Sequence, residues 1–173
     1  MSQHIIPMVL GGVPITPHSG PVRMRYEPFG GSAELRMADG TGIKQTHWRK
    51  TRILASGSGP LEPALEHLDY SGPLELWCVK PLAISGTALQ YQLPAAASRR
   101  PDVAPWAWAE VAGRWQDVAV AMDGDLATLT PPPGAGRYQV FWLPRYSVLT
   151  DGLVTDWDES QQRCDWSLEA RER

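Results

Sequence analysis

Apolar and polar side chains alternate along several short stretches of the chain, which is the pattern of half-buried β-strands. Residues 22–26 and 33–37 alternate in this way. Asp39-Gly40 follows the second stretch and predicts a tight hairpin turn. Residues 46–56 then predict a long strand that contains Trp48 and Ile53.

The rest of the chain continues the same pattern, and no segment has long helical periodicity. Further strands are expected at residues 74–79, 87–93, 137–143 and 164–168, with three short strands in residues 106–130. Residues 61–68 fit a two-turn helix or an ordered loop. We therefore expect an all-β fold with at most one short helix.

Proline and glycine divide the chain into three parts. Their spacing in residues 1–21 predicts an extended N-terminal arm or a short edge strand. Residues 22–93 together with 137–173 predict the core, a β-sandwich or barrel. Residues 94–136 predict a small inserted β module that begins with an Ala-, Pro- and Arg-rich linker.

Composition narrows the functional classes. The chain has 173 residues and a net charge of −3, which gives no reason to expect nucleic-acid binding. No stretch is long and apolar enough for a membrane span, and the N-terminus lacks the features of a signal peptide. Cys78 and Cys164 are expected to be buried thiols, with one disulfide as the alternative.

Catalytic or metal-binding motifs are not evident. The four histidines are scattered, so we expect no cofactor, no metal and no enzymatic activity. Asp156, Asp158 and Glu159 could supply calcium ligands or the acids of a hydrolase. The spacing of a calcium loop is missing, so we prefer a solvated acidic turn.

Charge is distributed unevenly along the chain. Residues 23–52 are mainly basic and residues 151–173 are mainly acidic. The preferred interpretation is ordinary solvated surfaces, or pairing within one subunit. The alternative is a head-to-tail contact between copies, which closes into a ring when the rotation permits. Its candidate residues are Arg49, Lys50, Arg52, Asp156, Asp158 and Glu159.

Eight tryptophans against two phenylalanines also allow two interpretations. Trp106 and Trp108 share one face of a predicted strand, and Trp115 is close in sequence. We prefer packing in the core of the insert. Alternatively, these three tryptophans form an exposed aromatic row that stacks on sugar rings or anchors a partner.

Several runs resemble tail-tip proteins of long-tailed, non-contractile bacteriophages. They are Thr46-His47-Trp48-Arg49-Lys50-Thr51, residues 56–59, residues 68–76 with Cys78, Tyr138-x-Val140 with Pro144, and residues 166–172. The family implied is the distal tail protein or a related baseplate protein, and the insert departs from it. The resemblance implies a tail-tube-like β-sandwich and a homo-oligomeric ring, commonly a hexamer. It also implies a virion structural role.

In that role the ring joins the tail tube to the hub and to the receptor-binding components, including the fibre. The protein would lie in the virion tail after assembly in the host cytoplasm. The insert would contact neighbouring parts or a cell-surface glycan. The alternative function is a carbohydrate-binding β-sandwich that uses the Trp-rich insert.

Overall fold

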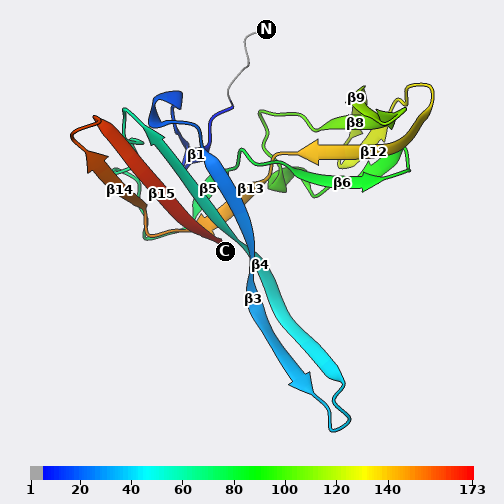
Figure 1. The fold of residues 1–173 in the computed structure, drawn as a ribbon, viewed down its shortest axis with the longest axis horizontal. Coiled ribbons are helices and arrows are strands. Elements are labelled where there is room, and N and C mark those ends of the chain that lie inside the picture. Colours follow the sequence, from blue (N-terminus) through cyan, green and yellow to red (C-terminus); the bar gives the residue numbers. More distant parts are fainter. Residues whose placement is uncertain (1–5) are drawn as a thin grey trace. The chain divides into compact units, whose positions relative to one another are not determined.

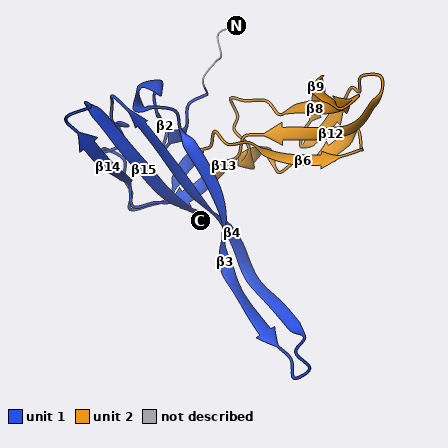
Figure 2. Ribbon diagram, in the orientation of Figure 1, with its two compact units in different colours: residues 1–76, 147–173 blue, residues 77–146 orange. Residues whose placement is uncertain are grey.

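The computed structural model describes residues 6–173 and is nearly all β, as the alternating sequence pattern predicted. Within this range there are fifteen strands and two three-residue 3-10 helices. None of the helices in the described part is long and apolar enough to cross a membrane. The chain forms two compact units, residues 1–76 with 147–173 (unit 1) and residues 77–146 (unit 2) (Figure 2).

Unit 1 is built on one eight-stranded sheet. Its elements are β1 (Val9–Leu10), β2 (Val13–Pro14), η1 (Pro17–Ser19), β3 (Arg23–Arg36), β4 (Gly42–Gly59), β5 (Leu74–Trp77), β13 (Arg145–Leu149), β14 (Leu153–Asp158) and β15 (Arg163–Glu172). The strand order is β2-β1-β5-β13-β15-β4-β3, and β14 also pairs with β15. The chain leaves unit 1 after β5 and returns through β13.

Strand β15 forms the centre of this unit. Its even-numbered residues from Cys164 to Ala170 are buried, and its odd-numbered residues in this stretch are exposed. This alternation places one face of β15 in the core. The Trp166 indole nitrogen donates a hydrogen bond of 2.8 Å to the carbonyl oxygen of Ser19, which ties the N-terminal segment to β15.

The N-terminal segment is not the extended arm expected for residues 1–21. Strands β1 and β2 form a small antiparallel hairpin at the edge of the sheet, next to β5. Met8, Leu10 and Ile15 are buried. Packing of these apolar side chains outweighs the breaks made by proline and glycine, and the chain follows the alternative of a short edge strand. Residues 1–5 lie outside the described residues.

Strands β3 and β4 form one long antiparallel hairpin that extends beyond the rest of the unit 1 sheet (Figure 1). The two strands expected at residues 22–26 and 33–37 are parts of β3. The Asp39-Gly40 turn is present: the Asp39 carboxylate accepts the Thr41 N–H at 2.9 Å, and Gly40 has φ 84°. Residues 61–68 form a loop rather than a helix, anchored by buried Leu65.

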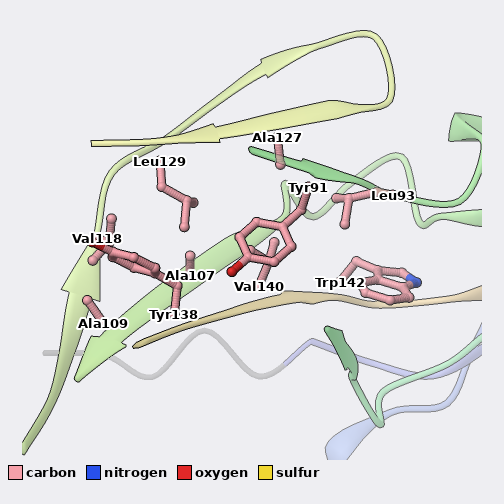
Figure 3. Packing of buried hydrophobic residues seen from close by; sticks show 10 residues of the cluster. All are labelled: Tyr91, Leu93, Ala107, Ala109, Val118, Ala127, Leu129, Tyr138, Val140 and Trp142. Carbon is pink, nitrogen blue, oxygen red and sulfur yellow. The ribbon is translucent and has the colours of Figure 1, made fainter. Parts of the chain in front are cut away.

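Unit 2 is a small β-sandwich of two sheets. Its elements are β6 (Leu82–Gly86), β7 (Gln90–Gln92), η2 (Ala96–Ser98), β8 (Trp106–Val111), β9 (Arg114–Val118), β10 (Val120–Asp123), β11 (Leu126–Leu129) and β12 (Ala135–Trp142). The sheet orders are β6-β12-β8-β9 and β10-β11-β7. Side chains from both sheets form its core (Figure 3): Tyr91, Leu93, Ala107, Ala109, Val118, Ala127, Leu129, Tyr138, Val140 and Trp142.

The inserted unit is wider than the expected 94–136. Strand β6 pairs with β12, and β7 pairs with β11, so strands that were expected in the core at 22–93 belong to unit 2. Residues 94–105 are not a free linker either. The Arg100 side chain is buried, donates to Asp102 at 2.7 and 2.9 Å, and also donates to the Cys78 carbonyl oxygen at 3.1 Å.

Candidate interaction surfaces

The projecting part of the β3–β4 hairpin, residues 29–49, is called the arm below. Its two faces differ in chemistry. Direct cross-strand pairs of an antiparallel sheet share a face, and Leu35 pairs with Ile43, Ala33 with Gln45, and Gly31 with Trp48. One face of the arm is therefore mainly apolar, and it carries Phe29, Ala33, Leu35, Ile43 and Trp48.

A β-bulge keeps Trp48 on this apolar face. Ser32 pairs with Thr46, whereas the preceding Gly31 pairs with Trp48, so His47 is the extra residue. The Trp48 ring meets the Phe29 ring edge-on, with 5.1 Å between centroids. A Cβ atom at Gly31 would lie 2.7 Å from the Trp48 indole nitrogen. Glycine at this position therefore allows the indole to lie across the neighbouring strand.

The apolar face of the arm is largely uncovered within its own chain. Leu35, Met37, Ile43 and Trp48 are each 40–55 % exposed. Monomeric proteins seldom leave a contiguous apolar row of this kind in water, because its burial is favourable. The arm is therefore a candidate contact surface. The sequence predicted that Trp48 lies in a strand, but it did not predict the exposed apolar face. Alternation of apolar and polar residues does not reveal whether other parts of the chain cover a given face of a strand.

A second exposed surface lies on the other side of β15 from β4, along β14 and the turn after it. Residues 153–159 are called the β14 edge. Val154 is 71 % exposed and Trp157 is 55 % exposed. Asp156, Asp158 and Glu159 are also exposed. The β14 edge therefore combines apolar side chains with negative charge.

Asp158 also has a local structural role. Its carboxylate accepts hydrogen bonds from the Ser160 hydroxyl at 2.6 Å and from the N–H groups of Ser160 and Gln161. These bonds, with that from the Ser160 side chain the largest, lower the pKa of Asp158. Asp158 thus stays negatively charged while it holds the turn between β14 and β15.

The structure separates the six charged residues that were candidates for the alternative, a contact between copies. Arg52 contacts Glu169 at 2.8 Å and Glu27 at 3.8 Å, so it follows the preferred interpretation of pairing within one subunit. In the described part of the chain, no ion pair involves Arg49, Lys50, Asp156 or Glu159. The unpaired positive charges belong to β4 near the base of the arm, and the unpaired negative charges belong to the β14 edge.

An open groove of about 710 Å³ crosses the sheet between these surfaces. Its walls come from β3, β4, β15, β14 and the segment leading into β14, and they include Arg23, Leu54, Val154 and Glu169. Charged side chains and apolar side chains line it together. Such a groove on an open sheet face can receive a chain segment as well as a small molecule.

The three tryptophans of the insert lie on the outer face of the β6-β12-β8-β9 sheet and do not form its core. Ala107 and Ala109 of β8 point into the sandwich, so Trp106 and Trp108, which alternate with them, point outward. Trp108 is 40 % exposed and Trp115 is 44 % exposed. The preferred interpretation of core packing is therefore wrong for them, because the small alanines occupy the inward positions.

Phe141 joins this group, and the sequence interpretation missed it. Trp106 and Phe141 stack with 5.5 Å between centroids and 10° between planes. Trp108 meets Phe141 edge-on at 4.9 Å. Position 141 lies between the inward-facing Val140 and Trp142, and this alternation in β12 is the signal that could have identified it.

The candidate chemistry of the remaining residues is limited. In residues 6–173 no group of three or more His, Cys, Asp and Glu side chains could hold a metal ion. No disulfide joins Cys78 and Cys164, and both are buried thiols, which was the preferred interpretation of the sequence. Burial is the main cause that raises the pKa of the Cys164 thiol, and Glu62, Asp165 and Asp156 add to it.

Comparisons with protein-family models, with curated proteins and with solved structures gave no significant match to this chain.

Proposed function

We propose that this protein is a structural component of a phage tail tip, where copies form a ring between the tail tube and the hub or receptor-binding parts. The resemblance in the sequence suggested this role. The structural observation that supports it is the arm, whose apolar face is exposed on a hairpin extending beyond its own sheet. Burial against a second copy would remove this face from water.

The second surface in the proposed contact is the β14 edge of the neighbouring copy. It has exposed apolar side chains, Val154 and Trp157, and unpaired carboxylates at Asp156 and Glu159. The base of the arm supplies positive charge from Arg49 and Lys50. Two different surfaces of one chain make a heterologous contact, and repeated heterologous contacts generate a ring when the rotation closes.

Oligomeric state provides the first test. Purified full-length chain should form closed rings in negative-stain electron microscopy and a matching single mass by mass photometry. The double substitution Leu35→Asp with Ile43→Asp should give folded monomers with an unchanged far-ultraviolet circular dichroism spectrum, because neither side chain is buried in the monomer. Leu61→Asp is the matched control, since Leu61 is exposed in a loop outside the arm. Only monomers in the unmodified protein would contradict the proposed ring.

A charge exchange tests the partners within the contact. Arg49→Glu with Lys50→Glu should weaken the ring at low salt, and the effect should fade as salt screens the charges. Adding Asp156→Lys and Glu159→Lys to the same chain should restore assembly, because every contact then has the charges exchanged. If the fourfold variant assembles no better than the double variant, the β14 edge is not the partner of the arm.

Location in the particle tests the tail-tip role itself. Immunogold labelling of intact phage particles with an antibody against this chain should mark the tail end distal to the capsid. Label on the capsid alone, or along the whole tail tube, would contradict the proposal. If the purified chain forms rings but the label lies elsewhere on the particle, the proposed assembly stands and the proposed tail-tip location is wrong.

A further inference from the structure

The outer face of the four-stranded sheet of unit 2 combines aromatic rings with polar side chains in a regular arrangement. Phe141 pairs with Trp106, Gln139 with Trp108, and Arg137 with Glu110 across β12 and β8. On the next strand Asp117 pairs with Trp108, and Trp115 pairs with Glu110. Direct pairs share a face of the sheet. The outer face therefore carries a cluster of aromatic rings bordered by hydrogen-bonding side chains.

Three of the rings support one another. Phe141 lies between Trp106, which stacks on it, and Trp108, which meets it edge-on. These contacts restrict the rotation of the rings, while Trp108 remains accessible to solvent. A ligand that stacks on Trp108 therefore meets a ring that is already oriented, and little conformational entropy is lost on binding.

Beside these rings lies an open hollow of about 480 Å³. It is lined by Ser85, Gly86, Thr87, Trp115, Arg137 and Gln139. In the described part of the chain no side-chain hydrogen bond or ion pair involves Arg137 or Gln139. A guanidinium, an amide and a hydroxyl thus converge on one hollow next to an exposed indole.

We propose that this face of unit 2, with Trp108 and Trp115 as its accessible rings and Arg137 and Gln139 as its polar contacts, binds a neutral carbohydrate chain. The C–H groups of a pyranose ring carry partial positive charge, and they pack on the negative face of an indole. The hydroxyl groups at the ring edge both donate and accept hydrogen bonds. Gln139 offers both functions in one side chain, and Arg137 offers a planar set of donors.

The same face fits other macromolecules less well. The centre of a protein–protein interface is usually depleted in charged residues, whereas Glu110, Asp117 and Arg137 lie among these rings. The carboxylates of Glu110 and Asp117 would repel the phosphates of a nucleic acid. A neutral chain of sugar rings meets neither obstacle. This proposal concerns unit 2 and goes beyond ring formation, which uses surfaces of unit 1.

Binding should be tested with the full chain on an array of neutral oligosaccharides and bacterial surface polysaccharides. Affinity for the best array member is then measured by tryptophan fluorescence titration. Trp115→Ala and Trp108→Ala should each weaken binding by about tenfold or more, the loss expected when one stacked ring is removed. Gln139→Ala should weaken it as well. Trp115 and Gln139 lie outside the core, so the melting temperatures of these two variants should stay within about 3 °C of the unmodified protein. Trp108→Ala also loses the edge-on contact with Phe141 and should melt a few degrees lower, so Trp115→Ala carries the test of binding at unchanged stability.

Leu61→Ala is the control, because it removes an exposed apolar side chain from a loop of unit 1 that lies outside the arm. It should bind the glycan as the unmodified protein does. The proposal is overturned by an absence of binding to every array member, or by unchanged affinity in both Trp108→Ala and Trp115→Ala. Binding of single-stranded oligonucleotides through these same rings would also overturn it.

The arm variant Leu35→Asp with Ile43→Asp tests the carbohydrate proposal independently of the proposed ring assembly. If the carbohydrate proposal holds, this monomeric variant should keep the single-site affinity for the glycan in the fluorescence titration. Glycan binding by a protein that forms no rings would support the carbohydrate surface and reject the proposed assembly. Rings without glycan binding would support the proposed assembly and reject the carbohydrate surface.

Discussion

Gly31 lies directly opposite Trp48 in the β3–β4 hairpin, and the Trp48 indole covers the position where a side chain at Gly31 would start. A Cβ atom there would be 2.7 Å from the indole nitrogen. Because the neighbouring bulge at His47 turns Trp48 toward the same face, one glycine and one extra residue together decide how the apolar face of the arm is built.

Gly31→Ala should therefore displace the Trp48 ring. We expect a changed near-ultraviolet circular dichroism signal and a weaker ring assembly, with a loss of unfolding free energy below about 1 kcal/mol, because the arm lies outside the core. Gly42→Ala is the control: the nearest atom to its Cβ position, the Glu34 carboxylate oxygen, is 3.9 Å away. Equal effects of both substitutions would show that the Trp48 contact is not the cause.

Gly57→Ala should destabilise unit 1. A Cβ atom at Gly57 would lie 2.6 Å from the ring of Trp166, which is buried and hydrogen-bonded to Ser19. Overpacking of this kind costs about 1–3 kcal/mol, which urea denaturation would measure. Gly72→Ala should have little effect, since no atom lies within 4 Å of its Cβ position. A Gly57→Ala protein as stable as the Gly72→Ala protein would contradict this view of the core.

Arg100→Ala should destabilise unit 2 by about 2 kcal/mol, the scale of losing hydrogen bonds to a charged group. The guanidinium is buried, lies 5.4 Å from the Trp77 ring centroid, and holds both Asp102 and the Cys78 carbonyl oxygen. Urea denaturation followed by circular dichroism would measure the loss. Arg137→Ala, which removes an exposed arginine with no ion pair in the described structure, should change stability by less than about 0.5 kcal/mol.

The ion pair between Arg100 and Asp102 makes the stability of unit 2 sensitive to acid. The side-chain hydrogen bond from Arg100 lowers the pKa of Asp102 in the folded protein. This contribution to stability is present above the pKa of an unfolded aspartate, about 4, and it is lost as pH falls through the lower folded value. Melting temperatures from pH 6 down to about pH 2 should therefore fall more steeply for the unmodified protein than for Asp102→Asn. Parallel curves would contradict this role of Asp102.

Cys164 should react slowly in the folded protein. Burial raises the pKa of its thiol, and the thiolate is the species that reacts with alkylating reagents. We expect labelling by iodoacetamide at pH 8 to be at least about tenfold slower in the native Cys78→Ser protein than in the same protein in denaturant. Equal rates in both conditions would show that Cys164 is accessible.

The all-β fold and most strands could be predicted because apolar and polar residues alternate along a strand when one of its faces is buried. The alternation around Leu35 and around Trp106 predicts a strand with two unlike faces. It does not say whether a face is covered by the same chain, by another molecule or by water. For that reason the arm and the outward position of Trp106 and Trp108 emerged only from the structure.

The unit boundary was harder to predict for a different reason. Residues 82–92 have ordinary strand patterns, and only their pairing with β12 and β11 assigns them to unit 2. Such pairing joins segments more than thirty residues apart, so no local pattern records it. The buried position of Arg100 was missed in the same way, because its partners Cys78 and Trp77 lie far away in sequence.

The position of β15 in the unit 1 sheet has a consequence for folding during synthesis. Strand β4 is translated early, but its pairing partner β15 follows more than one hundred residues later, as the separation of 117 between Arg52 and Glu169 shows. Unit 2 is complete before β15 emerges from the ribosome. In the meantime β4 has an open edge that could recruit strands from other nascent chains. Productive folding of unit 1 therefore depends on protecting that edge until translation reaches β15.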